Sequence, residues 1–193
     1  MAKAILMSIR PQYVAQILKG NKTIEVRKKF PKDYVGWVYI YCTKHKLSTA
    51  KYGYLNDIDY NYAKKIGLEK EILNGKVVAR FWCDKVEHFE FETVSRDIDG
   101  YWWDNGDMVD KKLLKQSCLT YDEFYDYIKC GEGYAIHISK LEVFDNLLML
   151  TMFRKPEFNK NIYDNNGNRL SLLERLRKYS IGKAPQSWCY IYE

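Results

Sequence analysis

The sequence lacks the long apolar runs of a membrane protein and the residue patterns of common metal and redox sites. It has no run of about 18 apolar residues, so we expect no membrane-spanning helix and no membrane partner. Its N-terminal apolar stretch is short and has no small-residue cleavage site, unlike a signal peptide. Five cysteines stand far apart without a C-x-x-C pair, and there are three histidines. We therefore expect a cytoplasmic protein with reduced thiols, no metal site and no cofactor.

The motifs of several large enzyme classes are missing as well. The sequence contains neither a Ser-His-Asp order nor a glycine-rich phosphate loop. What it does contain is charge that is unevenly distributed. Residues 1–51 hold 11 Lys and Arg against 2 Asp and Glu, residues 52–150 hold 12 against 19, and residues 151–193 hold 8 against 4. The two basic ends favour an anionic partner, although a solvated surface could show the same separation.

Hydrophobic periodicity predicts more strands than helices. Short runs that are apolar, or that alternate in polarity, recur along the chain and are typical of buried or half-buried strands. The fold class that this indicates is a mixed α+β, barrel-like domain. The predicted strands cover residues 3–9, 22–28, 37–44, 76–92, 134–144, 147–153 and 185–193.

Capping residues predict the positions of the helices. Thr120 and Glu123 have the spacing of a capping box, and Gly131 suits the end of that helix. The segment 99–110, "DGYWWDNGDMVD", is expected to be an irregular loop. The predicted helices cover residues 10–20, 120–131 and 170–180.

Length and composition indicate one domain over residues 1–193. A polar, tyrosine-rich segment around 47–75 is expected to be a helical insertion within it. A second polar segment, around 154–169, is expected to be a loop. The chain is long enough to bury a core without disulfides or metals.

Two stretches of the sequence resemble the ASCH domain family, which belongs to the PUA-like superfold. One consists of "SIRP" at Ser8–Pro11 and "ILKGNKTIEVRK" at Ile17–Lys28, with Pro31 after it. The other is "APQSWCYIY" at Ala184–Tyr192, which resembles the ending of the longer bacterial and phage members. The resemblance implies a small, partly closed β-barrel with flanking helices and a cleft beside the first helix.

The same resemblance implies a function in recognising nucleic acid. PUA-like relatives bind RNA or modified nucleobases, so we expect RNA or a nucleotide-like ligand in a basic cleft. As an alternative, some small ASCH proteins remove the acetyl group of N4-acetylcytidine, and ribonuclease activity is reported in others. A third interpretation is a regulatory protein that contacts a protein partner through the Trp102–Trp103 loop.

Lys22 and Glu25 are the catalytic candidates if the chain is an enzyme. Lys22 matches the catalytic lysine of the family motif G-x-K-T-x-x-x-R, but Glu25 stands where the small amidohydrolases have a threonine. A carboxylate does not replace a hydroxyl nucleophile, because its acyl product would be a mixed anhydride. Thr23 has a hydroxyl, but on a strand it lies on the opposite face from Lys22. Otherwise Glu25 pairs with Arg27 or Lys22, or accepts from a base amino group.

The position of Lys22 raises a further question. In an extended strand it would share the apolar face of Ile24 and Val26, which is costly for an ammonium group. Either the strand begins after Lys22, or its side chain reaches into a cleft. Arg10 stands at a helix entrance, where backbone N–H groups favour anions. The ligand-binding candidates are Ser8, Arg10, Lys22, Thr23, Glu25, Arg27, Lys28, Gln186 and Trp188, the last more typical of a core than of a stacking platform.

Overall fold

The protein forms two compact units within the residues that the structure describes. This computed structural model describes residues 3–44, 75–91, 94–96, 102–104, 111–129, 131–160 and 162–192. Unit 1 comprises Met1–Ala15, Gly36–Phe81 and Leu141–Glu193, and unit 2 comprises Gln16–Val35 and Trp82–Lys140. Apart from Gly75, the insertion predicted around 47–75 lies outside the described residues. The single-domain organisation stays a prediction.

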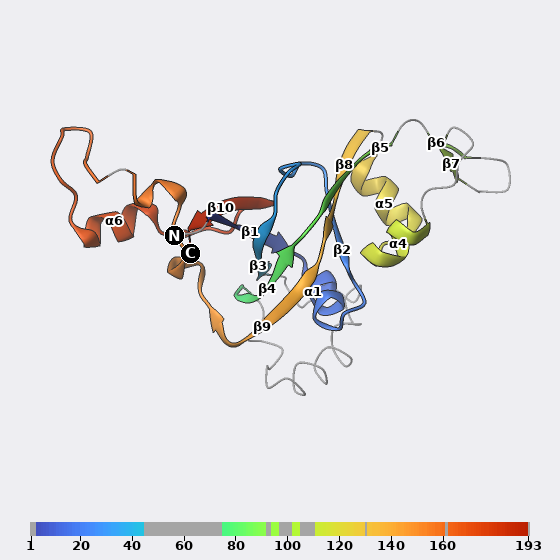
Figure 1. Ribbon diagram of the computed structural model, residues 1–193, viewed down its shortest axis with the longest axis horizontal. Helices are drawn as coiled ribbons and strands as arrows, with labels where there is room; N and C mark the ends of the chain where they lie inside the picture. The colour runs from blue at the N-terminus through green and yellow to red at the C-terminus, as the bar shows by residue number, and fades with distance from the viewer. Residues whose placement is uncertain are drawn as a thin grey trace. The chain divides into compact units, whose positions relative to one another are not determined.

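A five-stranded sheet is the main element of unit 1 (Figure 1). Its strands lie in the order β10 (Trp188–Tyr192), β1 (Lys3–Ile9), β3 (Gly36–Cys42), β4 (Val77–Cys83) and β9 (Ser139–Leu148). β1 pairs antiparallel with β10 and parallel with β3. All residues of β1 except the first are buried, as in a strand that is covered on both faces. The two ends of the chain thus meet in neighbouring strands.

Unit 1 contains a helical turn in a segment that the sequence predicts to be a strand. The predicted strand over 147–153 is wrong beyond Leu148, because the 3-10 helix η2 (Leu150–Met152) follows β9. This turn brings Phe153 into the apolar cluster on the sheet, where its ring centroid lies 5.1 Å from that of Tyr39. The free energy gained by burying the Phe153 ring offsets the cost of ending the strand at this point.

The C-terminal part of unit 1 contains two further helices. Within the polar segment 154–169 lies the 3-10 helix η3 (Pro156–Phe158). The predicted basic helix is confirmed as α6 (Leu172–Tyr179). Ser171 caps it by accepting from the backbone N–H of Glu174, whose side chain in turn accepts from the backbone N–H of Ser171. This reciprocal pair is a capping box that fixes the start of α6.

Unit 2 is built on an antiparallel three-stranded sheet with two helices beside it (Figure 1). The strands lie in the order β2 (Ile24–Arg27), β8 (Gly131–His137) and β5 (Val86–Phe91). The helices are α4 (Lys111–Ser117) and α5 (Tyr121–Ile128). The sequence predicts α5 but not α4. Both helices contribute apolar side chains to the cluster on this sheet.

Helix boundaries follow the predicted caps at most positions. α1 (Pro11–Leu18) begins at its proline, and Gly20 after it adopts a φ of 76°. The capping box of Thr120 and Glu123 on α5 is confirmed. The predicted stop at Gly131 is wrong, because Lys129 ends α5 with a φ of 57° and donates its N–H to the last turn.

Two segments predicted as single strands are each divided between the two sheets. The segment 76–92 forms β4 and β5, which are separated at exposed Asp84 and Lys85. The segment 134–144 forms β8 and β9, which are separated at Ile138. The Ile138 N–H donates to the Thr23 carbonyl oxygen, 2.9 Å away, rather than to a sheet partner. Alternating polarity indicates extended chain but does not show where the hydrogen-bonding partner changes.

The mixed α+β class is confirmed, whereas the barrel is not. In the described ranges no sheet closes on itself, so the partly closed β-barrel stays a prediction. Part of the segment 99–110, predicted as an irregular loop, is the strand β7 (Trp102–Asp104), which pairs with β6 (Val94–Arg96). The Trp102 and Trp103 side chains lie outside the described part, so their role in a protein contact stays a prediction. None of the described helices has the length and apolarity to cross a bilayer.

Candidate functional site

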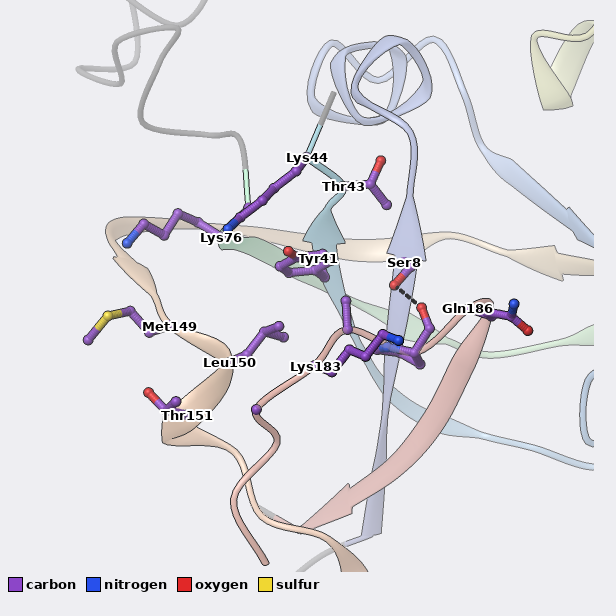
Figure 2. A pocket seen from close by; sticks show the side chains of 14 residues that line it. Ser8, Tyr41, Thr43, Lys44, Lys76, Met149, Leu150, Thr151, Lys183 and Gln186 are labelled. Atoms are coloured by element: carbon purple, nitrogen blue, oxygen red, sulfur yellow. Dashed lines mark hydrogen bonds between the residues drawn. The ribbon is translucent and has the colours of Figure 1, made fainter. Parts of the chain in front are cut away.

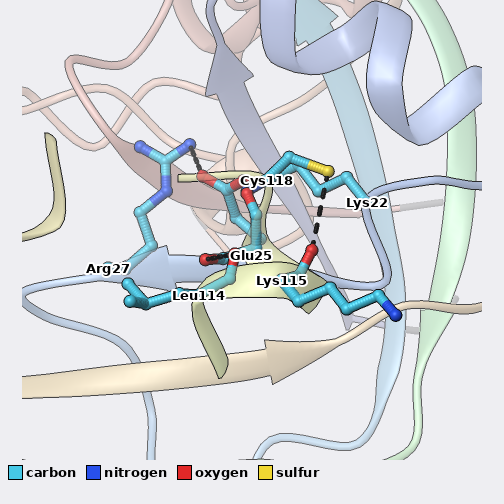
Figure 3. A network of polar contacts seen from close by, with 7 residues as sticks. Lys22, Glu25, Arg27, Leu114, Lys115 and Cys118 are labelled. Carbon is cyan, nitrogen blue, oxygen red and sulfur yellow. Dashed lines mark hydrogen bonds and ion pairs between the residues drawn. The ribbon is translucent and has the colours of Figure 1, made fainter. Parts of the chain in front are cut away.

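Lys22, Glu25 and Arg27 form an ion triad in unit 2 (Figure 3). The Lys22 Nζ atom lies 3.3 Å from Glu25 Oε2, and the Arg27 Nη2 atom lies 2.9 Å from Glu25 Oε1. All three residues are buried, with exposed fractions of 2%, 6% and 8% in chain order. Glu25 therefore bridges both cations, which is the ion-pair interpretation of this carboxylate.

The triad is tied to α4 through Lys22. β2 begins at Ile24, so the first of the two options for Lys22 is correct: the strand starts after it. Its Nζ donates to the backbone carbonyl oxygen of Ser117, 2.5 Å away, at the C-terminal end of α4. Carbonyl groups there carry partial negative charge and stabilise a cation. The buried Lys22 ammonium group, which would be costly without partners, thus contacts both the Glu25 carboxylate and the Ser117 carbonyl oxygen.

The geometry of the ion triad suits a structural connection better than ligand contact. A ligand that approached Lys22 or Arg27 would have to replace contacts that Glu25 and Ser117 already make. Separating buried charges from their partners is strongly unfavourable. Thr23 is exposed and holds unit 2 together through its backbone, which donates from its N–H to Gln116 and accepts from Ile138. Its hydroxyl is not part of the triad.

The remaining candidates lie elsewhere. Lys28 is exposed in unit 2, with its Nζ 5.5 Å from the ring centroid of Tyr127. Arg10 is exposed and accepts, through its backbone carbonyl oxygen, the first N–H groups of α1. Trp188 is half-buried on β10 and makes an edge contact with Tyr190, their ring centroids 5.4 Å apart. Trp188 therefore has the packing of a sheet residue.

Ser8 and Gln186 meet in a pocket of unit 1 with a volume of about 520 Å³ (Figure 2). Ser8 Oγ donates to the Pro185 carbonyl oxygen at 2.7 Å, and its N–H donates to the Ser187 carbonyl oxygen at 2.8 Å. These bonds fix the segment that carries Gln186, whose side chain is exposed. The pocket is lined by Ser8, Tyr41, Thr43, Lys44, Gly75, Lys76, Met149, Leu150, Thr151, Gly182, Lys183, Ala184, Pro185 and Gln186.

This cavity, the lysine pocket, has three cations and no carboxylate among the lining residues that the structure describes. Lys44 follows β3, Lys76 precedes β4 and Lys183 precedes β10. Among the described residues none of the three has an ion-pair partner within 4.0 Å. Burial, and to a lesser degree neighbouring Cys42, raises the pKa of Tyr41, so its hydroxyl keeps the proton that it could donate. The pocket thus presents positive charge and hydrogen-bond donors.

Sequence reasoning identified Ser8 and Gln186 but missed the three lysines. Lys44 is the last residue of one predicted strand, Lys76 is the first of another, and Lys183 stands two residues before a third; Lys76 and Lys183 each come directly after a glycine. Cationic residues at the ends of several strands are the signal that could have indicated a shared pocket. The candidates Lys22, Glu25 and Arg27 belong to unit 2, whereas Ser8 and Gln186 belong to unit 1.

The described cysteines are poor nucleophiles. Burial raises the pKa of Cys42 and of Cys83 to about 12. Burial also raises the pKa of Cys118, although nearby Lys22 acts in the opposite direction, and that of Cys189. The thiolate is the reactive form of cysteine, and none of these thiols is ionised near neutral pH. Within the described ranges there is also no group of His, Cys, Asp and Glu arranged to hold a metal ion.

We expect Cys42 and Cys83 to resist alkylation in the folded protein. Iodoacetamide from about pH 7 to about pH 9 should leave both unmodified, because their raised pKa keeps the thiols protonated throughout this range. After unfolding in guanidinium chloride both should be labelled. Peptide mass spectrometry measures the two states. Rapid labelling of Cys42 in the folded protein would contradict the burial of its thiol.

Comparison with known proteins adds a structural likeness. No family model matches the chain, and no curated protein matches it. Among solved structures, the chain is similar to the crystal structures of the ASCH protein from Zymomonas mobilis and of two mutants of it. These neighbours are ASCH proteins. The unmutated one is 13% identical at a TM-score of 0.46, covering 92% of this chain and 96% of that one. One mutant is 13% identical at a TM-score of 0.47, covering 91% and 92%.

Proposed function

We propose that this protein is an ASCH-type protein that binds RNA or a modified nucleotide through the lysine pocket of unit 1. The observation that carries the proposal is that Lys44, Lys76 and Lys183 line one cavity and that none of the described residues lining it is a carboxylate. Phosphate groups are the complement of such a surface. Two stretches that resemble ASCH sequences, "SIRP" and "APQSW", each contribute lining residues, which further supports a ligand site here.

The ion triad supports binding over hydrolysis. Both catalytic candidates, Lys22 and Glu25, are buried and paired with each other. A general acid or base has to reach the proton that it transfers, directly or through one water. Binding of an anion in the lysine pocket does not require Lys22 or Glu25 to leave its partner. The basic cleft is therefore assigned to unit 1 in this proposal rather than to the family motif around Lys22.

Single-stranded RNA should bind with a strong dependence on salt. If the pocket lysines neutralise phosphate charge, log Kd should rise with log salt concentration with a slope of about 0.7 for each charge neutralised, up to roughly 2. The Lys183→Gln variant should lower this slope by about 0.7. Fluorescence anisotropy with a labelled single-stranded RNA, measured at several KCl concentrations, gives both values.

A matched control is available in unit 2. Lys32 is exposed and is not among the residues that line the lysine pocket. Lys32→Gln removes the same charge from the chain as Lys183→Gln, and it should leave the slope unchanged. Absent binding, binding that is insensitive to salt, or equal effects of the two variants would contradict the proposal.

A further inference from the structure

We propose that the lysine pocket recognises a single nucleotide unit that ends in a phosphomonoester, rather than the internal phosphodiesters of a strand. The inference rests on the proposed function and specifies its ligand. Two sources share this chemistry: a free nucleoside monophosphate and the phosphorylated end of an RNA chain. Four properties of the pocket support the inference: its charge, the backbone positions that carry its lysines, the apolar and polar residues of its lining, and its size.

Charge favours a phosphomonoester over a phosphodiester. Three lysines line one cavity of unit 1, and none of the described residues around it is a carboxylate. A phosphomonoester carries about −1.5 to −2 charges at pH 7 and has three acceptor oxygens. An internal phosphodiester carries only one negative charge. A terminal phosphate therefore balances the pocket better, and its three oxygens can accept from three separate ammonium groups.

Backbone hydrogen bonds at the ends of β3 and β4 fix the chain positions from which two of the lysines extend. The Gly75 N–H donates to the Cys42 carbonyl oxygen and the Cys42 N–H donates to the Lys76 carbonyl oxygen, both at 2.9 Å. Gly75 has a φ of 78°, and a Cβ atom there would lie 2.8 Å from Lys44 Cε. The Lys44 side chain thus lies directly across Gly75, whose positive φ favours glycine. Figure 2 shows Lys44 and Lys76 on the same side of the pocket.

Other residues of the lining suit a base and its polar edge. Met149 and Leu150 line it with apolar surface, and Met149 is 53% exposed. An aliphatic or thioether surface packs against the face of a base. Gln186 is held beside Ser8 by the bonds to Pro185 and Ser187, and its amide offers both donors and an acceptor. A glutamine amide can therefore read a base edge.

Size limits the ligand to a small molecule or one end of a chain. The volume of about 520 Å³ lies within the usual range of small-molecule sites, roughly 300–1,000 Å³. Proteins that bind the interior of a single strand instead use a charged groove that follows several phosphates. The lining of this cavity combines cationic, apolar and polar residues, which suit the phosphate, the base face and the base edge of one nucleotide.

Calorimetric titration with AMP, adenosine and inorganic phosphate tests the inference. AMP should bind at least about tenfold more tightly than adenosine, since hydrogen bonds from ammonium groups to phosphate are stronger than those between neutral groups. Inorganic phosphate should compete with AMP. The triple variant Lys44→Gln, Lys76→Gln, Lys183→Gln should lose AMP affinity about tenfold or more, whereas Lys155→Gln, an exposed lysine outside the pocket lining, should not change it. If the triple variant does not fold, Lys183→Gln alone should weaken AMP binding several-fold.

RNA oligonucleotides with and without a 5′ or 3′ phosphate distinguish the two sources. Preference for a phosphorylated end that disappears in the triple variant supports capture of an RNA end. AMP binding without RNA binding supports the free nucleotide and overturns RNA as the ligand of the proposed function. RNA binding that ignores the terminal phosphate, together with equal affinity for AMP and adenosine, overturns the inference while leaving RNA binding in place. Absence of binding to every probe overturns both.

Discussion

Replacement of Glu25 by glutamine should lower the free energy of unfolding by about 3–5 kcal/mol, because it leaves two buried cations without their shared anion. Lys22 would keep the Ser117 carbonyl oxygen as a partner, but its ammonium group would lose the carboxylate 3.3 Å away. Arg27 would lose the oxygen at 2.9 Å. Urea unfolding, followed by far-UV circular dichroism, measures the change.

The matched control is an exposed ion pair in the same chain. Arg80 Nε lies 2.7 Å from Glu142 Oε2, and about half of the Glu142 side chain is exposed. Glu142→Gln removes the same charge and keeps the same shape, but water solvates the groups that remain, so the expected cost is about 0–1 kcal/mol. Equal costs for the two variants would show that the ion triad is not desolvated.

Replacement of Phe124 by alanine should lower the free energy of unfolding by about 3–5 kcal/mol. Phe124 is 1% exposed on α5 and packs in the apolar cluster of unit 2, with its ring centroid 5.6 Å from that of Phe89. The substitution removes buried surface and leaves a cavity that the surrounding strands and helices cannot fill completely. Urea unfolding again gives the value.

Tyr127, one turn further along α5, provides the comparison for Phe124. Its side chain is 39% exposed, so Tyr127→Ala removes an aromatic ring from the same helix while creating little internal cavity. We expect a loss of about 1 kcal/mol or less. A similar loss for both variants would mean that α5 is not packed through its Phe124 face.

Local sequence signals predicted the elements whose determinants lie within a few residues of each other. Pro11 and Gly20 bracket α1, and the Thr120–Glu123 capping box starts α5, because caps satisfy backbone groups within a single turn. Strand ends were less predictable. Two long predicted strands each divide between two sheets, since a strand's hydrogen-bonding partner comes from a distant part of the sequence.

The charge pairing along β2 was also partly visible in the sequence. Glu25 and Arg27 stand two residues apart on one strand, so their side chains share a face and can pair. The alternation of side chains between the two faces of a strand likewise left two options for Lys22. In the structure the strand begins after it. The local pattern could not supply the Ser117 carbonyl group, which lies 95 residues further along the chain.

By itself the sequence determined the α+β class, the start of most helices, the alternation of apolar and charged residues along β2, and the resemblance of both ends of the chain to one family. Only the tertiary structure decided which cations are paired with a carboxylate in the interior and which line a pocket. Lys22 and Arg27, in the most basic motif, are paired inside unit 2. Among the described residues, Lys44, Lys76 and Lys183 have no ion-pair partner and line one pocket, because the sheet of unit 1 brings together strand ends that the sequence keeps apart.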